Sequence, residues 1–163
     1  MSKKFLWVLI LLTALFGAVN ICSARDLMIN PDEFYTRFCY IANGAYEGRF
    51  CSGSLQEHYG AYTFETVGGY TITLYSTSLK KDCEYAKIHF SLAGTNGTQL
   101  WTALLAFFLA ADNNIFLDES QEEVLMDYIK NLSSNIGKTV TFDRIRIYGG
   151  TSGGKYYFTA EGK

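Results

Sequence analysis

The stretch TQLWTALLAFFLAA, residues 98–111, decides the fold of this chain. It predicts a helix with apolar side chains on nearly every side, and such a helix is buried inside a domain. Thr98 can cap its start, and the polar run that begins at Asp112 ends it. With about twelve apolar residues the helix is too short to cross a bilayer. We therefore expect a central buried helix that other elements cover.

Two further helices are predicted on the two sides of this stretch. In the first, Asn30 can cap the start, Pro31 suits the first helical position, and Asn43-Gly44 is a stop signal. In the second, Asp118 can cap a helix that runs to about Asn135. Both carry one apolar stripe, so we expect each to lie against the core.

Segments rich in β-branched and aromatic residues predict about five strands, at 62–67, 70–76, 84–92, 139–148 and 156–160. Gly68-Gly69 is a hairpin signal between the first two, and the glycines of 149–154 separate the last two as a loop. The order is therefore α-β-β-β-α-α-β-β. Hairpins and short links predict an α+β domain, with an antiparallel sheet and about three helices packed on one face.

The predicted strand 139–148 contains a change of apolar parity. Val140 and Phe142 share one face, whereas Ile145 and Ile147 share the other. One inserted residue would bring the four side chains to the same face. We therefore predict a β-bulge near Asp143-Arg144.

Residues 1–24 have the pattern of a secretory signal peptide. Lys3 and Lys4 form a basic start, an apolar run extends from Phe5 to Ile21, and Ala24 is a small exit residue. We predict cleavage near Ala24, so that residues 25–163 form a single α+β domain that is secreted or periplasmic. The apolar run reaches the lower limit for a membrane span, about 17 residues, so a retained anchor is the alternative.

Charge and motif content exclude several classes of function. The formal net charge is −2, and removal of Lys3 and Lys4 with the signal peptide makes it −4. That mild acidity argues against nucleic acid or an anionic membrane as the main partner. The two histidines, His58 and His89, lie far apart in sequence, and no Cys-x-x-Cys occurs, so we expect no metal site and no cofactor.

Cys22 leaves with the signal peptide, and the exported chain retains Cys39, Cys51 and Cys83. An odd number of cysteines in an oxidising compartment suggests one disulfide and one free thiol. We predict the disulfide Cys51–Cys83, because Cys51 follows a glycine-containing loop and Cys83 opens a strand, and we leave Cys39 as a buried thiol. Spacing does not fix connectivity, so three unpaired thiols are the alternative.

In residues 40–53, YIANGAYEGRFCSG, an aromatic and glycine-rich stretch precedes Cys-Ser-Gly. This segment resembles the nucleophile region of NlpC/P60-type cell-wall cysteine peptidases. The resemblance implies Cys51 as nucleophile and His89 as base, and makes a cell-wall cysteine hydrolase the alternative function. Phe50 stands where the family has an acidic residue. In addition, Cys51 leads into a strand rather than into a helix that would lower the pKa of its thiol.

Strand alternation also gathers basic and aromatic side chains on the sheet face that points away from the helices. This predicted binding set comprises Tyr85, Lys87, His89, Arg144, Arg146 and Tyr148. Aromatic residues and arginine make good contact anchors, and a basic-aromatic surface on an acidic domain fits an acidic peptide or a glycan. An ordinary solvated sheet face is the alternative, because Arg, Lys, Thr and Tyr are common there.

No complete set of nucleophile, base and orienting group can be assembled from these residues, and neither can a set of metal ligands. We therefore lean against an enzyme. The sequence favours a small exported domain that binds a protein or glycan partner in the cell envelope or outside the cell.

Overall fold

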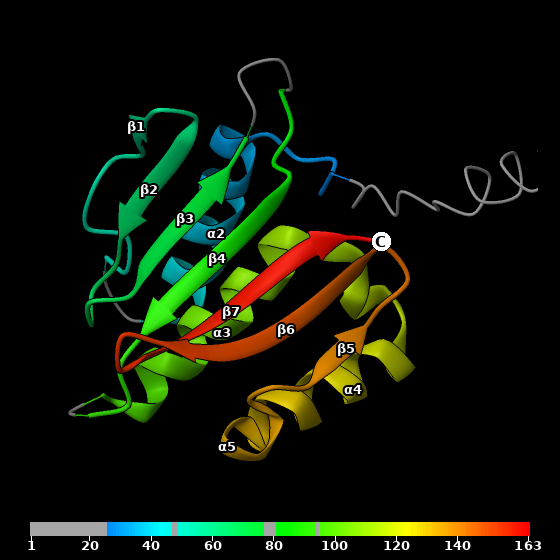
Figure 1. The fold of residues 1–163 in the computed structure, drawn as a ribbon. Helices are drawn as coiled ribbons and strands as arrows, with labels where there is room; N and C mark the ends of the chain where they lie inside the picture. Colours follow the sequence, from blue (N-terminus) through cyan, green and yellow to red (C-terminus); the bar gives the residue numbers. More distant parts are fainter. Residues whose placement is uncertain (1–25, 47–48, 77–80, 94) are drawn as a thin grey trace, which may run out of the picture.

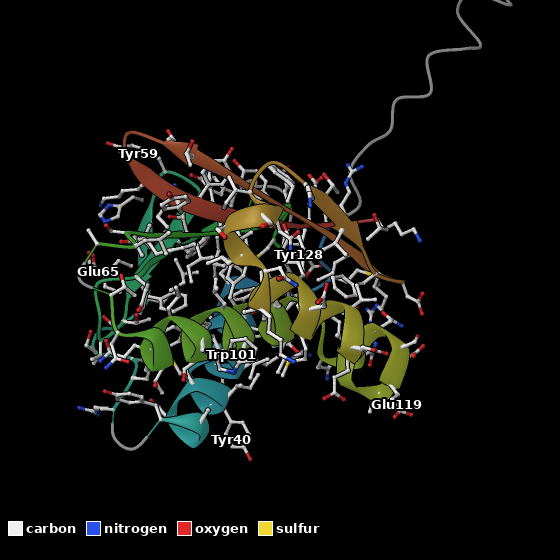
Figure 2. All side chains as sticks on the ribbon, turned by 90° about the horizontal axis from the view of Figure 1, so that it is seen from below. Tyr40, Tyr59, Glu65, Trp101, Glu119 and Tyr128 are labelled. Carbon is white, nitrogen blue, oxygen red and sulfur yellow. A yellow bond between two sulfur atoms is a disulfide. The ribbon has the colours of Figure 1, made fainter. Side chains whose placement is uncertain are left out.

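The computed structural model describes residues 26–46, 49–76, 81–93 and 95–163. These residues form a seven-stranded antiparallel sheet in the order β1-β2-β3-β4-β7-β6-β5, and Figures 1 and 2 show the helices on one side of it. The α+β class is confirmed, although the sheet has more strands than the about five predicted. The predicted signal peptide, residues 1–24, lies outside the described residues.

The two long helices begin at asparagine caps. α2 spans Pro31–Ala45, and the side chain of Asn30 accepts a hydrogen bond from the Glu33 N–H at 2.9 Å. α3 spans Gly97–Ala111 and is capped by Asn96, so the prediction that Thr98 caps it is wrong. The Asn96 side chain accepts the Thr98 N–H at 2.9 Å, which places Thr98 inside the first turn.

The third predicted helix is divided. After the 3₁₀-helix η1, Asn113–Leu117, α4 spans Glu119–Lys130 with Asp118 as its cap. Asn131 then has φ −98° and ψ 35°, which interrupts the helix before the short α5, Leu132–Asn135. Among the described residues, none of these helices has the length and hydropathy of a membrane span.

The strands are short at both edges of the sheet and longer in its middle. Their bounds are Gln56–His58 for β1, Ala61–Glu65 for β2, Thr71–Tyr75 for β3, Tyr85–Phe90 for β4, Thr139–Thr141 for β5, Ile145–Ser152 for β6 and Lys155–Gly162 for β7. β1 lies in a glycine-interrupted stretch for which no strand was expected.

The predicted bulge near Asp143-Arg144 is wrong, because the chain reverses direction there. β5 and β6 form a hairpin in which Val140 pairs with Ile147, and the Phe142 N–H donates to the Ile145 carbonyl at 2.8 Å. Residues opposite each other in an antiparallel pair share a face. The four apolar side chains therefore face the core together without an inserted residue.

The glycine-rich loop between the last two strands is also shorter than predicted. Only Gly153 and Gly154 form the turn, with φ of 58° and 77°, and Ser152 pairs with Lys155 directly before and after them. Two consecutive positive φ values are typical of a type I′ hairpin turn. Gly149 and Gly150 lie inside β6, where they pair with Phe158 and Tyr157.

The core lies between α3 and the sheet. Leu104, Phe107 and Phe108 of α3 are fully buried, and the Phe108 ring meets Phe158 of β7 edge to face at 5.8 Å between centroids. Figure 2 shows α2 and α3 on the same side of the sheet, with Trp101 on the far side of α3 from the strands. α2 also packs on the sheet, because the Tyr35 and Phe38 rings meet the Phe64 ring of β2 with centroids 5.0 and 5.2 Å apart. The expected central buried helix is therefore present.

The described chain begins with a segment that is fixed to the start of β4. The Leu27 N–H donates to the Cys83 carbonyl, and the Cys83 N–H donates to the Ile29 carbonyl, both at 2.8 Å. Leu27 and Ile29 are 5 % and 2 % exposed. These contacts fix the segment from Leu27 to Ile29 against Cys83, just before β4.

Candidate functional site

No described helix covers the outer face of the sheet, which Figure 1 shows turned toward the viewer. The strand registers place Tyr85, Lys87 and His89 of β4 on this face, as predicted, together with Arg146 and Tyr148 of β6. β7 lies between β4 and β6 and contributes the side chains that the sequence analysis missed, Lys155, Tyr157, Thr159 and Glu161.

Five of these side chains lie together on β4, β7 and β6, and we call them the basic patch: Lys87, His89, Tyr148, Lys155 and Tyr157. The Lys87 Nζ lies 3.9 Å from the centre of the Tyr157 ring. The His89 and Tyr148 rings lie 6.1 and 6.5 Å from the same ring, measured between centroids. A cation over a tyrosine face is a favourable contact, and it holds the Lys87 ammonium above the sheet.

In the part of the chain that the structure describes, no carboxylate neutralises the lysines of the basic patch. Among the described residues, neither Lys87 nor Lys155 forms an ion pair with a carboxylate. Burial lowers the pKa of His89, and the charges of Lys87 and Lys155 lower it further. An anion bound at the basic patch would neutralise the charges of both lysines and favour protonation of His89. The basic patch is therefore suited to binding an anion.

The two arginines of the predicted set do not join the basic patch. Arg146 forms an ion pair with Glu161 of β7, so its charge is already compensated. Arg144 lies in the turn between β5 and β6, and its guanidinium lies 4.0 Å from the Met28 sulfur. The structure therefore brings the β4 residues and Tyr148 together but leaves the arginines apart from them.

Gly150 allows Tyr157 to lie across β6. A Cβ at Gly150 would come within 2.5 Å of the Tyr157 hydroxyl oxygen, so no other residue leaves room for the ring in this position. Beneath the cluster, Thr159 is only 1 % exposed although no element covers this face. The side chains of the basic patch therefore pack on one another across the strands.

The predicted disulfide Cys51–Cys83 is wrong, because Cys51 is bonded to Cys39. The Phe50 N–H donates to the Asn43 side chain at 2.7 Å, which holds the loop against α2 next to Cys39. Cys51 forms a β-bridge with Thr66, after the end of β2, whereas Cys83 lies before β4, beside the other end of β3. The length of β3, about 17 Å, separates the two positions.

Among the cysteines that the structure describes, Cys83 is the free thiol, in place of Cys39, and it is fully buried. Burial raises the pKa of Cys83 to about 12, and Asp82 and Asp26 add smaller effects in the same direction. A buried thiol with a raised pKa carries almost no thiolate at neutral pH. Cys83 therefore acts as a small core residue.

The residues implied by the peptidase resemblance do not meet. The Cys51 sulfur is part of a disulfide, and Cys51 itself lies in the core on the helix side of the sheet. His89 lies on the outer face, because its neighbours Ile88 and Phe90 point into the core. His58 is exposed on the edge strand β1.

Comparisons with family models, with curated proteins and with solved structures find no match to this chain. Within the described part of the chain, no group of His, Cys, Asp and Glu side chains has the arrangement of a metal site. Function is therefore inferred from the geometry of the uncovered sheet face.

Proposed function

We propose that this chain is an exported, non-enzymatic binding domain and that the basic patch holds an acidic glycan. The observation that carries the proposal is an uncovered sheet face on which Lys87 and His89 lie against the Tyr157 ring and Lys155 lies near enough to His89 to lower its pKa. Within the described residues, neither lysine has a carboxylate partner. Export follows from the predicted signal peptide, and the Cys39–Cys51 disulfide is consistent with an oxidising compartment.

The composition of the face favours a glycan over a protein partner. By the strand registers, the side chains that point outward are mostly hydroxyl-bearing, aromatic or charged. Ala61 is the single aliphatic side chain at the outward positions of the described strands. The buried centre of a protein interface is mostly apolar, which this face does not offer. Tyrosine rings can stack on the C–H faces of sugars, while ammonium and imidazolium groups bind sugar carboxylates.

Polygalacturonate is a suitable probe, because it combines sugar rings with one carboxylate per residue. Its binding to residues 25–163 would be measured by calorimetry, beside neutral dextran and polyglutamate. We expect binding to polygalacturonate that weakens with added salt, because the charges on the patch are exposed to solvent.

Matched variants locate the site. Lys87→Gln and Lys155→Gln should each weaken binding by about two- to fivefold, and Tyr157→Ala by about fivefold or more. Lys130→Gln is the control, because Lys130 is an exposed lysine on α4, on the opposite side of the sheet.

Four results would contradict the proposal. The first is the absence of binding to polygalacturonate, and the second is equal binding of dextran, which would remove the role of charge. The third is binding to polyglutamate alone, which would identify an acidic peptide as the partner. An equal loss of affinity in Lys130→Gln would show a general charge effect rather than a site.

A further inference from the structure

A second feature of the outer face lies at the end of the sheet away from His89, where β1 meets β2 and β3 meets β4 (Figure 1). It is an open hollow of about 630 Å³, which we call the tyrosine hollow. Its lining residues are Tyr59, Gly60, Ala61, Tyr75, Ser76, Glu84 and Tyr85. Three of the seven are tyrosines, and none carries a positive charge.

Tyr59 occupies a position that its backbone does not favour. Tyr59 and Gly60 form the two-residue turn between β1 and β2, with φ of 51° and 81°. Such a turn prefers Asn or Gly at its first position, and a bulky residue there is strained. The Tyr59 side chain is fully exposed, at 108 %, so no packing contact compensates for the strain. Figure 2 shows Tyr59 on the side of the molecule opposite Trp101 and Tyr40.

The other two rings form the wall of the hollow. Tyr75 of β3 and Tyr85 of β4 are paired in register, and their rings stack with centroids 4.3 Å apart and planes 20° apart. A tyrosine face carries partial negative charge, which attracts cations. Burial raises the pKa of Tyr85, and Tyr75, Tyr148 and Glu84 raise it further, so the phenol is neutral at neutral pH.

Glu84 gives the hollow its formal charge. No residue described by the structure forms an ion pair with its carboxylate. Glu161, which pairs with Tyr85 in register, is already paired with Arg146. An unpaired carboxylate beside three tyrosine rings is the reverse of the basic patch, and it is complementary to a positively charged group.

We infer that the tyrosine hollow binds an organic ammonium group, held by the carboxylate of Glu84 and the rings of Tyr59, Tyr75 and Tyr85. The ring of Tyr59 stands free at the tip of the hairpin, where it can close on the ligand. This site is independent of the proposed glycan site, because the two share no residue and have opposite charge.

Choline is the first probe, and 3,3-dimethylbutan-1-ol is its neutral counterpart of the same shape. Nα-acetyl-lysine amide tests a primary ammonium group in place of a quaternary one. Titrations of residues 25–163, followed by the amide signals of the hollow in two-dimensional NMR, would give the dissociation constants. We expect at least one of the two cations to bind about fivefold or more tightly than the neutral alcohol. The cation that binds more tightly identifies the kind of ammonium group.

Two variants test the residues. Glu84→Gln should weaken cation binding by about fivefold, and Glu119→Gln, an exposed glutamate at the start of α4, is its control. Tyr59→Asn should weaken binding while raising the melting temperature, because Asn suits the turn. That increase in stability would show that the loss of binding is not a folding defect.

The inference is overturned if the neutral alcohol binds as tightly as both cations, or if neither cation binds at the highest soluble concentrations. It is also overturned if Glu84→Gln binds the cation as well as the unchanged chain does. Cation binding that is lost in Lys87→Gln but kept in Glu84→Gln would place the ligand elsewhere on the face, and would equally contradict it.

Discussion

Gly149 and Gly150 are neighbours in β6, and side chains added to them would point to opposite faces of the sheet. A Cβ at Gly149 would come within 2.4 Å of the Phe158 ring in the core. A Cβ at Gly150 would come within 2.5 Å of the Tyr157 hydroxyl on the outer face. Phe158 is fully buried and has no room to move, whereas Tyr157 is half-buried and can turn toward solvent.

The two alanine substitutions should therefore have different consequences. Overpacking a core costs about 1–3 kcal/mol, and replacing Gly by Ala in a strand recovers about 0.5–1 kcal/mol. We expect Gly149→Ala to lower the free energy of unfolding by about 1–2 kcal/mol, which lowers the melting temperature by about 2–8 °C for a domain of roughly 150 residues. Gly150→Ala should leave stability within about 0.5 kcal/mol of the unchanged chain, because its clash is relieved by an exposed ring.

Thermal unfolding followed by circular dichroism would measure both variants, and polygalacturonate titration would measure their binding. Gly150→Ala should bind less well although it is folded, because the displaced Tyr157 ring no longer supports Lys87. The reasoning is refuted if Gly149→Ala is as stable as the unchanged chain. It is also refuted if Gly150→Ala is the less stable of the two, because the register of β6 against β7 would then be wrong.

Three further predictions concern the cysteines and His89. Replacing Cys39 and Cys51 by serine should lower the free energy of unfolding by about 3 kcal/mol, because the unfolded chain gains conformational freedom when the loop is opened. A loss below about 1 kcal/mol in urea unfolding would contradict this. Cys83 should react with a thiol reagent only after unfolding, and rapid reaction in the native protein would show that it is not buried. Burial lowers the pKa of His89, and a bound anion raises it. The affinity for polygalacturonate should therefore increase as the pH falls from about 7.5 to about 5. The sugar carboxylates, with a pKa of about 3.5, stay ionised over this range. His89→Gln should abolish that increase, and an unchanged pH profile in this variant would remove His89 from the site.

The strongest periodic signals of the sequence predicted the α+β class and its central elements correctly. The all-apolar stretch before Asp112 forms the buried helix α3, and the alternation from Tyr85 to Phe90 gives β4 one buried and one outer face. One error falls at a turn that lacks a distinctive residue. Asp143-Arg144 contains no glycine or proline, so the parity change there resembled a bulge, although it marks a reversal of the chain.

The candidate sites were predicted only in part, because a site depends on which strands are neighbours. Parity identified the outward residues of β4 and β6, but nothing in the sequence indicated that β7 lies between them and contributes Tyr157. Tyr59 was missed because the glycines around it indicated an irregular loop. The pairing of Cys39 with Cys51 depends on a contact between the loop and α2, which spacing along the chain does not encode.

The hydrogen bonds that join Leu27 and Ile29 to Cys83 limit how far the folded domain can stand from anything attached before it. If residues 1–24 stayed in place as an anchor, the distance from Ile21 to Leu27 would be at most about 22 Å, the length of six fully extended residues. Cys83 directly precedes Glu84, so the tether would emerge next to the tyrosine hollow. An anchored chain would thus present that hollow close to the lipid headgroups, whereas cleavage near Ala24 would free both ends of the sheet to face solution.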